Sequence, residues 1–175
     1  MLMTYAMKYD APVGPLTILS DGESITQVLF ANQACSDEMI QTGNVPILQQ
    51  AEAWLDCYFS GEKPQPSLKL KPEGTPFQQK VWQLLSEIPY GHVVTYGELA
   101  TKIAKQLGKS HMSAQAVGGA VGRNPISIIV PCHRVVGKDG SLTGFGGTID
   151  NKIKLLQLEG VNMSALYRPK YSTKP

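Results

Sequence analysis

The chain contains no uninterrupted apolar run that approaches the roughly 20 residues needed to cross a bilayer as a helix. Its opening segment, residues 1–10, lacks both the basic start and the apolar stretch of a secretory signal peptide. The sequence therefore predicts a protein that is neither inserted in a membrane nor exported, and the cytoplasm is the expected location.

Cysteine and charge are also scarce. The three cysteines, Cys35, Cys57 and Cys132, are an odd number without close pairing, which argues against a disulfide framework. Neither they nor the three histidines show C-x-x-C or H-x-x-x-H spacing, so no metal site is predicted. Charged residues make up 17% of the chain and leave a net charge of +2, which neither requires nor opposes a polyanionic partner.

The chain does have enough material for a packed core. Its 175 residues correspond to roughly one domain of average size or two small ones. Hydrophobic residues make up 42% of the sequence, so intrinsic disorder is excluded as the main description.

The first third of the sequence predicts small strands followed by one helix. Residues 15–20 and 25–30 are apolar segments on either side of the turn signal Asp21-Gly22, which indicates a hairpin. Apolar residues then recur at helical spacing over residues 46–59, and Gly61 follows as a stop signal.

Proline and glycine are concentrated in residues 61–76, around one short predicted strand, Ser67–Leu70. This composition is typical of a linker, and we place a domain boundary within it. The second part opens with an amphipathic helix predicted over residues 77–88, with Thr75 and Pro76 at its N-cap and first positions.

Two further helices are predicted close together. A capping box formed by Thr95 and Glu98 starts one helix, which is expected to run to about Leu107. A loop over residues 108–111 leads to a second helix over residues 113–121. Two short helices joined by a tight basic turn have the outline of a helix-turn-helix, although most helix pairs simply pack together.

The second of these helices is unusually rich in small residues. The pair Gly118-Gly119 costs roughly 1 kcal/mol per glycine relative to alanine inside a helix. Either this helix crosses close to its neighbour, or it lies against something bulky and flat, such as a nucleic-acid backbone.

The residue types that carry chemistry follow a β-branched run, Ile126–Val130, which predicts a buried strand. Pro131 has no N–H for a ladder and must end that strand, so Cys132 is expected at its mouth. Neighbours such as His133 and Arg134 lower the pKa of a thiol and raise its thiolate fraction. A structural cysteine beside a core histidine and a solvated arginine is the alternative interpretation.

The string Pro131-Cys-His-Arg-Val135 resembles the active-site signature of the O6-alkylguanine-DNA alkyltransferases, also called methylated-DNA–protein-cysteine methyltransferases. The likeness extends in order over nearly all of the second part of the chain, through Thr75–Trp82, Ile88–Tyr96, Ala116–Ala120, Asn124-Pro125, Gly144–Gly147 and Leu155–Gly160. The first third is compatible with the variable N-terminal domain of that family but carries no signature of it.

This resemblance implies an α/β (α+β) fold in two parts. Residues 1–70 are expected to form a small ribonuclease-H-like domain. Residues 74–165 are expected to form a helical catalytic and DNA-binding domain, with a helix-turn-helix at about 95–122 and an active-site strand and loop.

The resemblance also implies DNA repair by direct reversal of damage. In this family a cysteine thiolate displaces the alkyl group from the O6 oxygen of guanine and keeps it, so the protein acts once and needs no cofactor. Cys132 is the implied acceptor, and His133 would relay the thiol proton through a water toward Glu159. Asn124 would hold the helix-turn-helix against the active-site strand. O4-alkylthymine is an additional candidate substrate.

A guanine inside a duplex must leave the base stack to reach a buried thiol, at a cost of a few kcal/mol. The resemblance implies that Tyr96 presses on the 3′ phosphate during this rotation and then hydrogen-bonds the flipped base. The implied base pocket consists of Val135, Phe145, Gly146, Gly147 and Lys152. A solvated lysine at a helix start is the alternative for Lys152.

The implied partner is double-stranded DNA, contacted in the minor groove by the helix-turn-helix of a monomer. The implied DNA-binding residues are Tyr96, Gly97, Gln115, Ala116, Gly118, Gly119 and Arg123. Gln115 stands where the family usually has an arginine that fills the space of the flipped base, so we expect weaker or more salt-tolerant binding. The longer turn before it contains Lys105, Lys109 and His111, which either contact a phosphate or form a solvated loop.

Two other functions are compatible with parts of this pattern. A lesion sensor on the same scaffold would bind damaged DNA without repairing it, but such proteins lack the acceptor cysteine that is present here as Cys132. A cysteine hydrolase would normally take its histidine from a distant part of the chain.

Overall fold

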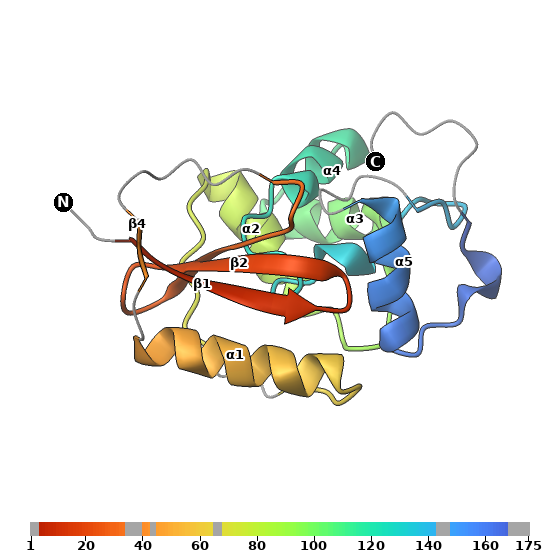
Figure 1. Cartoon of the computed structure of the whole chain (residues 1–175). Helices are drawn as coiled ribbons and strands as arrows, with labels where there is room; N and C mark the ends of the chain where they lie inside the picture. Colours follow the sequence, from red (N-terminus) through yellow and green to blue (C-terminus); the bar gives the residue numbers. More distant parts are fainter. Residues whose placement is uncertain (1–3, 34–39, 43–44, 65–67, 143–147, 168–175) are drawn as a thin grey trace. The chain divides into compact units, whose positions relative to one another are not determined.

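The computed structural model describes residues 4–33, 40–42, 45–64, 68–142 and 148–167. The chain folds into two compact units (Figure 1). The N-terminal unit contains residues 1–73 together with 125–127, and the C-terminal unit contains residues 74–124 and 128–175. No helix in the described parts of the chain has both the length and the apolar content needed to span a membrane.

The described residues of the N-terminal unit form a four-stranded sheet and one helix (Figure 1). Its elements are β1 (Thr4–Ala11), β2 (Gly14–Ser20), β3 (Ile25–Leu29), β4 (Ile40–Thr42) and α1 (Pro46–Phe59). The strand order is β3-β2-β1-β4, with β2 antiparallel to both of its neighbours and β4 parallel to β1. The predicted hairpin and helix are present, and β1 and β4 extend the sheet beyond the hairpin.

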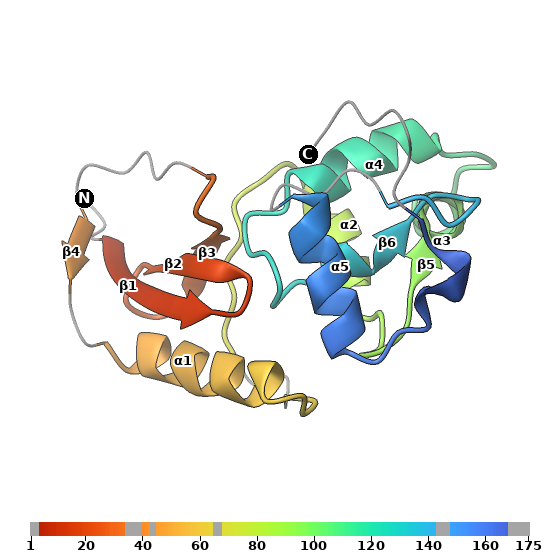
Figure 2. The same ribbon diagram turned by 45° about the vertical axis from the view of Figure 1, so that its right-hand side comes forward.

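Helix α1 lies along one side of this sheet (Figures 1 and 2). Leu48, Ala51 and Leu55 recur on one face of the helix and are at most 1% exposed. On β2, Leu16 and Ile18 are fully buried and provide the opposing core. The alternation of the strand and the period of the helix thus bury one face of each element, as the sequence pattern predicted.

The prediction of a buried strand over residues 126–130 is wrong. Only Ile126 pairs with a strand, through an isolated bridge to Val28. The backbone then turns, and Ile128 has a φ of 73°, a value that β-branched residues rarely adopt. Ile126, Ile128 and Val130 are at most 2% exposed, so the apolar run reports burial correctly but not extended structure. Leu70, in the predicted strand of the linker, likewise forms only a bridge, to Ile25.

The C-terminal unit is mostly helical (Figure 2). Its elements are α2 (Pro76–Leu85), β5 (Val94–Thr95), α3 (Tyr96–Gln106), α4 (Ala114–Gly122), a 3₁₀ turn η1 (Cys132–Arg134), β6 (Val135–Val136), α5 (Ile149–Leu158) and η2 (Met163–Ala165). Strands β5 and β6 pair in parallel, and the indole N–H of Trp82 on α2 donates to the carbonyl of Ala120 on α4 at 2.9 Å.

The start of each predicted helix in this unit agrees with the structure, because capping side chains determine it. Thr75 and Gln78 form a reciprocal capping box on α2, and the Thr95 hydroxyl accepts from the Glu98 N–H at the start of α3. Helix α2 ends at Leu85 rather than Ile88. Pro89 disfavours helical geometry at the residue before it, which explains part of this earlier end.

Candidate functional site

Cys132, His133 and Arg134 form the short 3₁₀ turn η1, which follows directly after Pro131. The Cys132 N–H donates to the Val130 carbonyl at 2.8 Å, and the Arg134 N–H donates to the Pro131 carbonyl at 3.1 Å. The Cys132 side chain is a reduced thiol, and all three residues are buried. The turn thus points three chemically active side chains into the interior of the C-terminal unit.

Glu159 is the residue onto which the neighbours of Cys132 converge. It caps the C-terminal end of α5 and is buried. Its Oε2 lies 2.5 Å from Nε2 of His133 and accepts from Nη2 of Arg134 at 3.1 Å. Its Oε1 accepts from Nε of Arg134 at 2.8 Å and from the Gly91 N–H at 3.0 Å. Both carboxylate oxygens are therefore occupied by donors.

These contacts determine the protonation states. Burial alone would raise the pKa of Glu159, but hydrogen bonds and charge from His133 and Arg134 lower it to about 2. Burial lowers the pKa of His133, against the opposing effect of Glu159. At neutral pH the pair is thus an ionised carboxylate and a neutral imidazole. Because a carboxylate can only accept, Nε2 carries the imidazole hydrogen and Nδ1 is the basic nitrogen.

Arg134 is buried, so the alternative of a solvated arginine is wrong, and the sequence did not indicate its bonds to Glu159. Besides its two bonds to Glu159, its Nη1 donates to the Ile88 carbonyl at 2.7 Å. The guanidinium carbon lies 5.7 Å from the centroid of the Tyr90 ring. Ile88 and Tyr90 belong to a segment that carried the family resemblance. Arg134, which contacts this segment, lies 46 residues after Ile88 in the sequence. This separation concealed the contact.

Gly91 completes the site from the same loop. Its φ is 80°, and a Cβ atom built on it would lie 3.2 Å from the Glu159 carbonyl oxygen. The position therefore requires glycine for its backbone conformation and for its close approach to Glu159.

Lys152 on α5 is fully buried, so the alternative of a solvated lysine is wrong. Its Nζ donates to the Val135 carbonyl at 2.6 Å. Burial lowers the pKa of Lys152 to about 8, although the negative charge of a Cys132 thiolate acts to raise it. A buried ammonium is thus electrostatically coupled to the candidate nucleophile.

Asn124 is buried just beyond the end of α4. Its Nδ2 donates to the Val130 carbonyl at 2.8 Å, the same carbonyl that accepts from the Cys132 N–H. Asn124 therefore links the end of α4 to the turn that carries the thiol. This contact joins the predicted helix-turn-helix to the nucleophile.

The predicted DNA-contacting residues lie on α3 and α4. Tyr96 is the half-buried first residue of α3, and a Cβ on Gly118 would lie 3.6 Å from its ring, which is ordinary contact. A Cβ on Gly119 would have no described atom within 4 Å, so no close helix crossing explains that glycine. The exposed positions are Gly97, Gln115, Ala116, Gly119 and Arg123.

The predicted base pocket is described only in part. Val135 is buried in β6, and its carbonyl accepts from Lys152. Phe145, Gly146 and Gly147 lie outside the described residues, as does Cys35.

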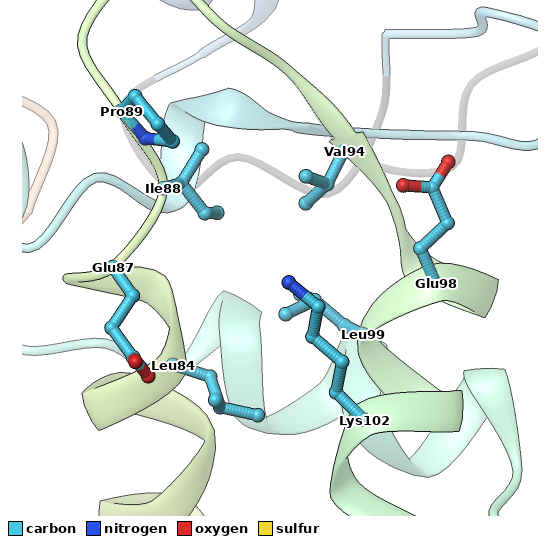
Figure 3. Close-up of a pocket in the computed structure, with 8 residues that line it drawn as sticks. All are labelled: Leu84, Glu87, Ile88, Pro89, Val94, Glu98, Leu99 and Lys102. Carbon is cyan, nitrogen blue, oxygen red and sulfur yellow. The ribbon is translucent and has the colours of Figure 1, made fainter.

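A separate pocket lies in the C-terminal unit between α2, the following loop and α3 (Figure 3). It is lined by Leu84, Glu87, Ile88, Pro89, Val94, Glu98, Leu99 and Lys102. None of the candidate catalytic side chains lines it, so it is distinct from the thiol site.

Comparison with protein families identifies both parts of the chain. Residues 4–72 match the ribonuclease-like domain of 6-O-methylguanine DNA methyltransferase, and residues 76–161 match the DNA-binding domain of the same enzyme. The chain belongs to the O6-methylguanine DNA methyltransferase family. The predicted family and its two-part α/β fold are thereby confirmed.

Individual members of this family resemble the chain along most of its length. A methylated-DNA–protein-cysteine methyltransferase of Haemophilus influenzae is 48% identical over 92% of this chain and 89% of its own length. One of Methanosarcina acetivorans is 44% identical over 90% of this chain and 99% of its own length.

Solved structures of family members agree with the fold. The O6-methylguanine methyltransferase of Mycobacterium tuberculosis has a TM-score of 0.76 at 42% identity, covering 90% of this chain and 93% of its own. The Mycobacterium tuberculosis OGT protein in complex with DNA has a TM-score of 0.78 at 41% identity, covering 89% of this chain and 92% of its own.

Replacing Arg134 tests the energetics of the buried network. Arg134→Met would leave the Glu159 charge buried with fewer donors, and breaking a buried ion pair in this way costs about 3–5 kcal/mol. We expect a loss of this size in the free energy of unfolding, measured by urea denaturation at pH 7. The double variant Arg134→Met/Glu159→Gln has no uncompensated carboxylate and should recover part of the loss. A single variant as stable as the parent would contradict this account.

Lys152 should impose a pH dependence on stability. Its folded pKa of about 8 lies below the ordinary value of 10.5, so the unfolded chain binds more protons between these pH values. The free energy of unfolding of the parent should therefore increase as the pH is raised through this window. By conversion at about 1.4 kcal/mol per pKa unit, the buried charge costs on the order of 3 kcal/mol at pH 7.

The Lys152→Met variant lacks this titration. Its stability relative to the parent should be most favourable at pH 7 and decline toward pH 10, measured by urea denaturation at each pH. Loss of the donor to the Val135 carbonyl offsets part of its advantage at every pH. Parallel pH profiles for parent and variant would contradict the assignment of a charged, buried Lys152.

Proposed function

We propose that this protein repairs O6-methylguanine in duplex DNA by transferring the methyl group to Cys132, irreversibly and once per molecule. The observation that carries the proposal is the buried thiol beside a neutral imidazole, which an ionised carboxylate holds in place. A nucleophile, an adjacent base and a third group that orients the base are the parts that such a displacement needs. Family membership supplies the substrate.

The proton of the thiol ends on His133 in this proposal. Basic Nδ1 takes it, directly or through a water, while Nε2 keeps its hydrogen bond to Glu159. With a pKa of about 2 and four hydrogen-bond donors, Glu159 stays ionised and stabilises the imidazolium rather than taking the proton. The relay therefore stops one residue earlier than the expected transfer toward Glu159.

The transfer itself is a single displacement. The Cys132 sulfur forms a bond to the methyl carbon while the bond from that carbon to O6 breaks, and the electron pair goes to the guanine. The guanine takes up one proton, equivalent to the one lost by the thiol, and leaves as the normal base. The Lys152 ammonium, coupled to the charge of Cys132, favours the thiolate before attack.

The damaged base reaches this buried thiol by rotating out of the duplex. We assign the minor-groove contact to α3 and α4, with Tyr96 at the base and the uncharged residues Gln115, Ala116 and Gly119 against the groove. Arg123, exposed after α4, adds a positive charge for the backbone. We expect the protein to act as a monomer in the cytoplasm, where a stoichiometric thiol acceptor is kept reduced.

The proposal is tested by mixing equimolar protein with duplex DNA that carries one O6-methylguanine, followed by intact and peptide mass analysis. We expect a gain of one methylene on the peptide that contains Cys132, with one protein consumed per lesion. Cys132→Ala should show no gain, and Cys57→Ala, which alters a thiol in α1, should behave as the parent.

The other outcomes separate the alternatives. Tight lesion binding without a mass gain would indicate a lesion sensor. Catalytic turnover of an ester or amide, with no methyl transfer, would indicate a cysteine hydrolase. If the protein neither binds the lesion nor takes up the methyl group, the proposal is overturned entirely.

Gln115 provides a test of the DNA-binding surface. Gln115→Arg adds a charge near the start of α4, so we expect several-fold tighter duplex binding at low salt and a steeper loss of affinity with salt. Gln115→Met has a similar length without charge and should bind within about twofold of the parent. A salt titration by fluorescence anisotropy measures both, and unchanged affinity of the arginine variant would contradict the assignment.

A further inference from the structure

The excess of positive over negative charge lies in one part of the chain. Residues 1–73 contain four lysines or arginines against nine acidic residues, a net charge of −5. Residues 74–175 contain twelve against five, a net charge of +7. The match to a DNA-binding domain lies within this second part.

Helix α4, the candidate recognition helix, contributes none of this charge. Its nine residues, Ala114–Gly122, include no charged side chain. Binding to the phosphate backbone depends mainly on lysine and arginine. The charge that brings α4 to DNA therefore comes from residues beside it, of which Arg123 after the helix is one.

The turn that leads into α4 supplies such residues. We call Lys105, Lys109 and His111 the basic turn; all three side chains are exposed, and all three line one pocket. Ala100 and Ala104, which are buried and small, lie on the same pocket, together with Ala114 at the start of α4. The pocket is thus lined in part by small apolar residues, and the basic side chains lie around them.

The local backbone explains why the two lysines border the same pocket. Helix α3 ends at Gln106, and Gly108 takes a φ of 67°, which glycine adopts without strain. The Lys109 N–H then donates to the Ala104 carbonyl at 2.8 Å. This bond holds Lys109 against the last turn of α3, which carries Lys105.

Lys102, one turn earlier on α3, lies in a different setting. It lines the pocket between α2 and α3, together with Glu87 and Glu98 (Figure 3). Its charge is therefore placed near two carboxylates, whereas Lys105 and Lys109 line a pocket to which no described acidic residue contributes. The two faces of α3 thus differ in the environment of their lysines.

We propose that Lys105 and Lys109 bind a backbone phosphate of duplex DNA at this pocket, with His111 beside it, and supply the charge that α4 lacks. This inference rests on the proposed function, because it takes DNA as the partner of α4. The contact reads no base and no lesion, since it involves only the phosphate. It sets how strongly the protein holds any duplex while α4 and Tyr96 deal with the damaged nucleotide.

The test uses the full chain and the variants Lys105→Gln, Lys109→Gln and their combination, with Lys102→Gln as the matched control on the same helix. Affinity for a fluorescent duplex is measured by anisotropy from low to moderate salt, with and without one O6-methylguanine. We expect the double variant to bind both duplexes about tenfold more weakly at low salt, and to lose about one unit of the slope of log affinity against log salt. Lys102→Gln should remain within about twofold of the parent.

Transfer of the methyl group is measured in parallel at saturating duplex. The double variant should still methylate Cys132 completely, because the substitutions weaken binding and leave the chemistry intact. Parent-like affinity and slope in the double variant, with methyl transfer normal throughout, would overturn the basic-turn inference alone. An equal loss in Lys102→Gln would also overturn it, since any lysine of α3 would then serve. Absence of transfer in the parent would instead overturn the proposed function.

Discussion

Glu159 holds a negative charge in the interior of the C-terminal unit, and the arrangement of the site follows from how that charge is compensated. A buried carboxylate is costly unless hydrogen-bond donors surround it. Four donors from two other segments do so here: the imidazole of His133, two nitrogens of Arg134 and the N–H of Gly91. Satisfying one carboxylate therefore fixes the turn after Pro131, the loop around Gly91 and the end of α5 relative to one another.

The same compensation limits what Glu159 can do in the reaction. A carboxylate stabilised enough to lower its pKa to about 2 is a very weak base. In the proposed reaction its contribution is therefore to orient His133 and to stabilise the protonated form of that imidazole. Lys152 is a second buried charge, and its pKa of about 8 shows that its burial is costly. Proteins tolerate such costs mainly at functional sites, where charge has to be positioned in advance of the reaction. Stability and reactivity are thus opposed at Lys152, whereas the ionised form of Glu159 is stabilised by its donors.

Much of this structure could be predicted from local sequence signals, whereas contacts between residues distant in the sequence could not. Capping residues such as Thr75 and Thr95 correctly predicted where helices start, because each cap is formed by residues within four positions of one another. The Ile126–Val130 run predicted a strand because a run of buried β-branched residues can occur both in a strand and in a buried turn. The positive φ of Ile128 distinguishes the two, and the sequence does not report it. The motif indicated Cys132, His133 and Glu159, but not that Arg134 joins Glu159 to Ile88, which needs three distant segments together. Whether a lysine such as Lys152 is solvated also depends on packing that no local pattern reports.

The absence of charge on α4 becomes understandable when the tasks on the DNA are separated. In the proposed complex, α4 comes close to a groove wall from which a base has rotated, and small side chains favour that approach. Gly119 has open space around it among the described atoms. A long charged side chain there would occupy that space and hold the helix farther from the duplex. Lysines before the helix, at Lys105 and Lys109, can instead attract the backbone without crowding the groove. In this proposal the residues of α4 need only allow close approach to the groove, because the lysines beside the helix provide the long-range attraction.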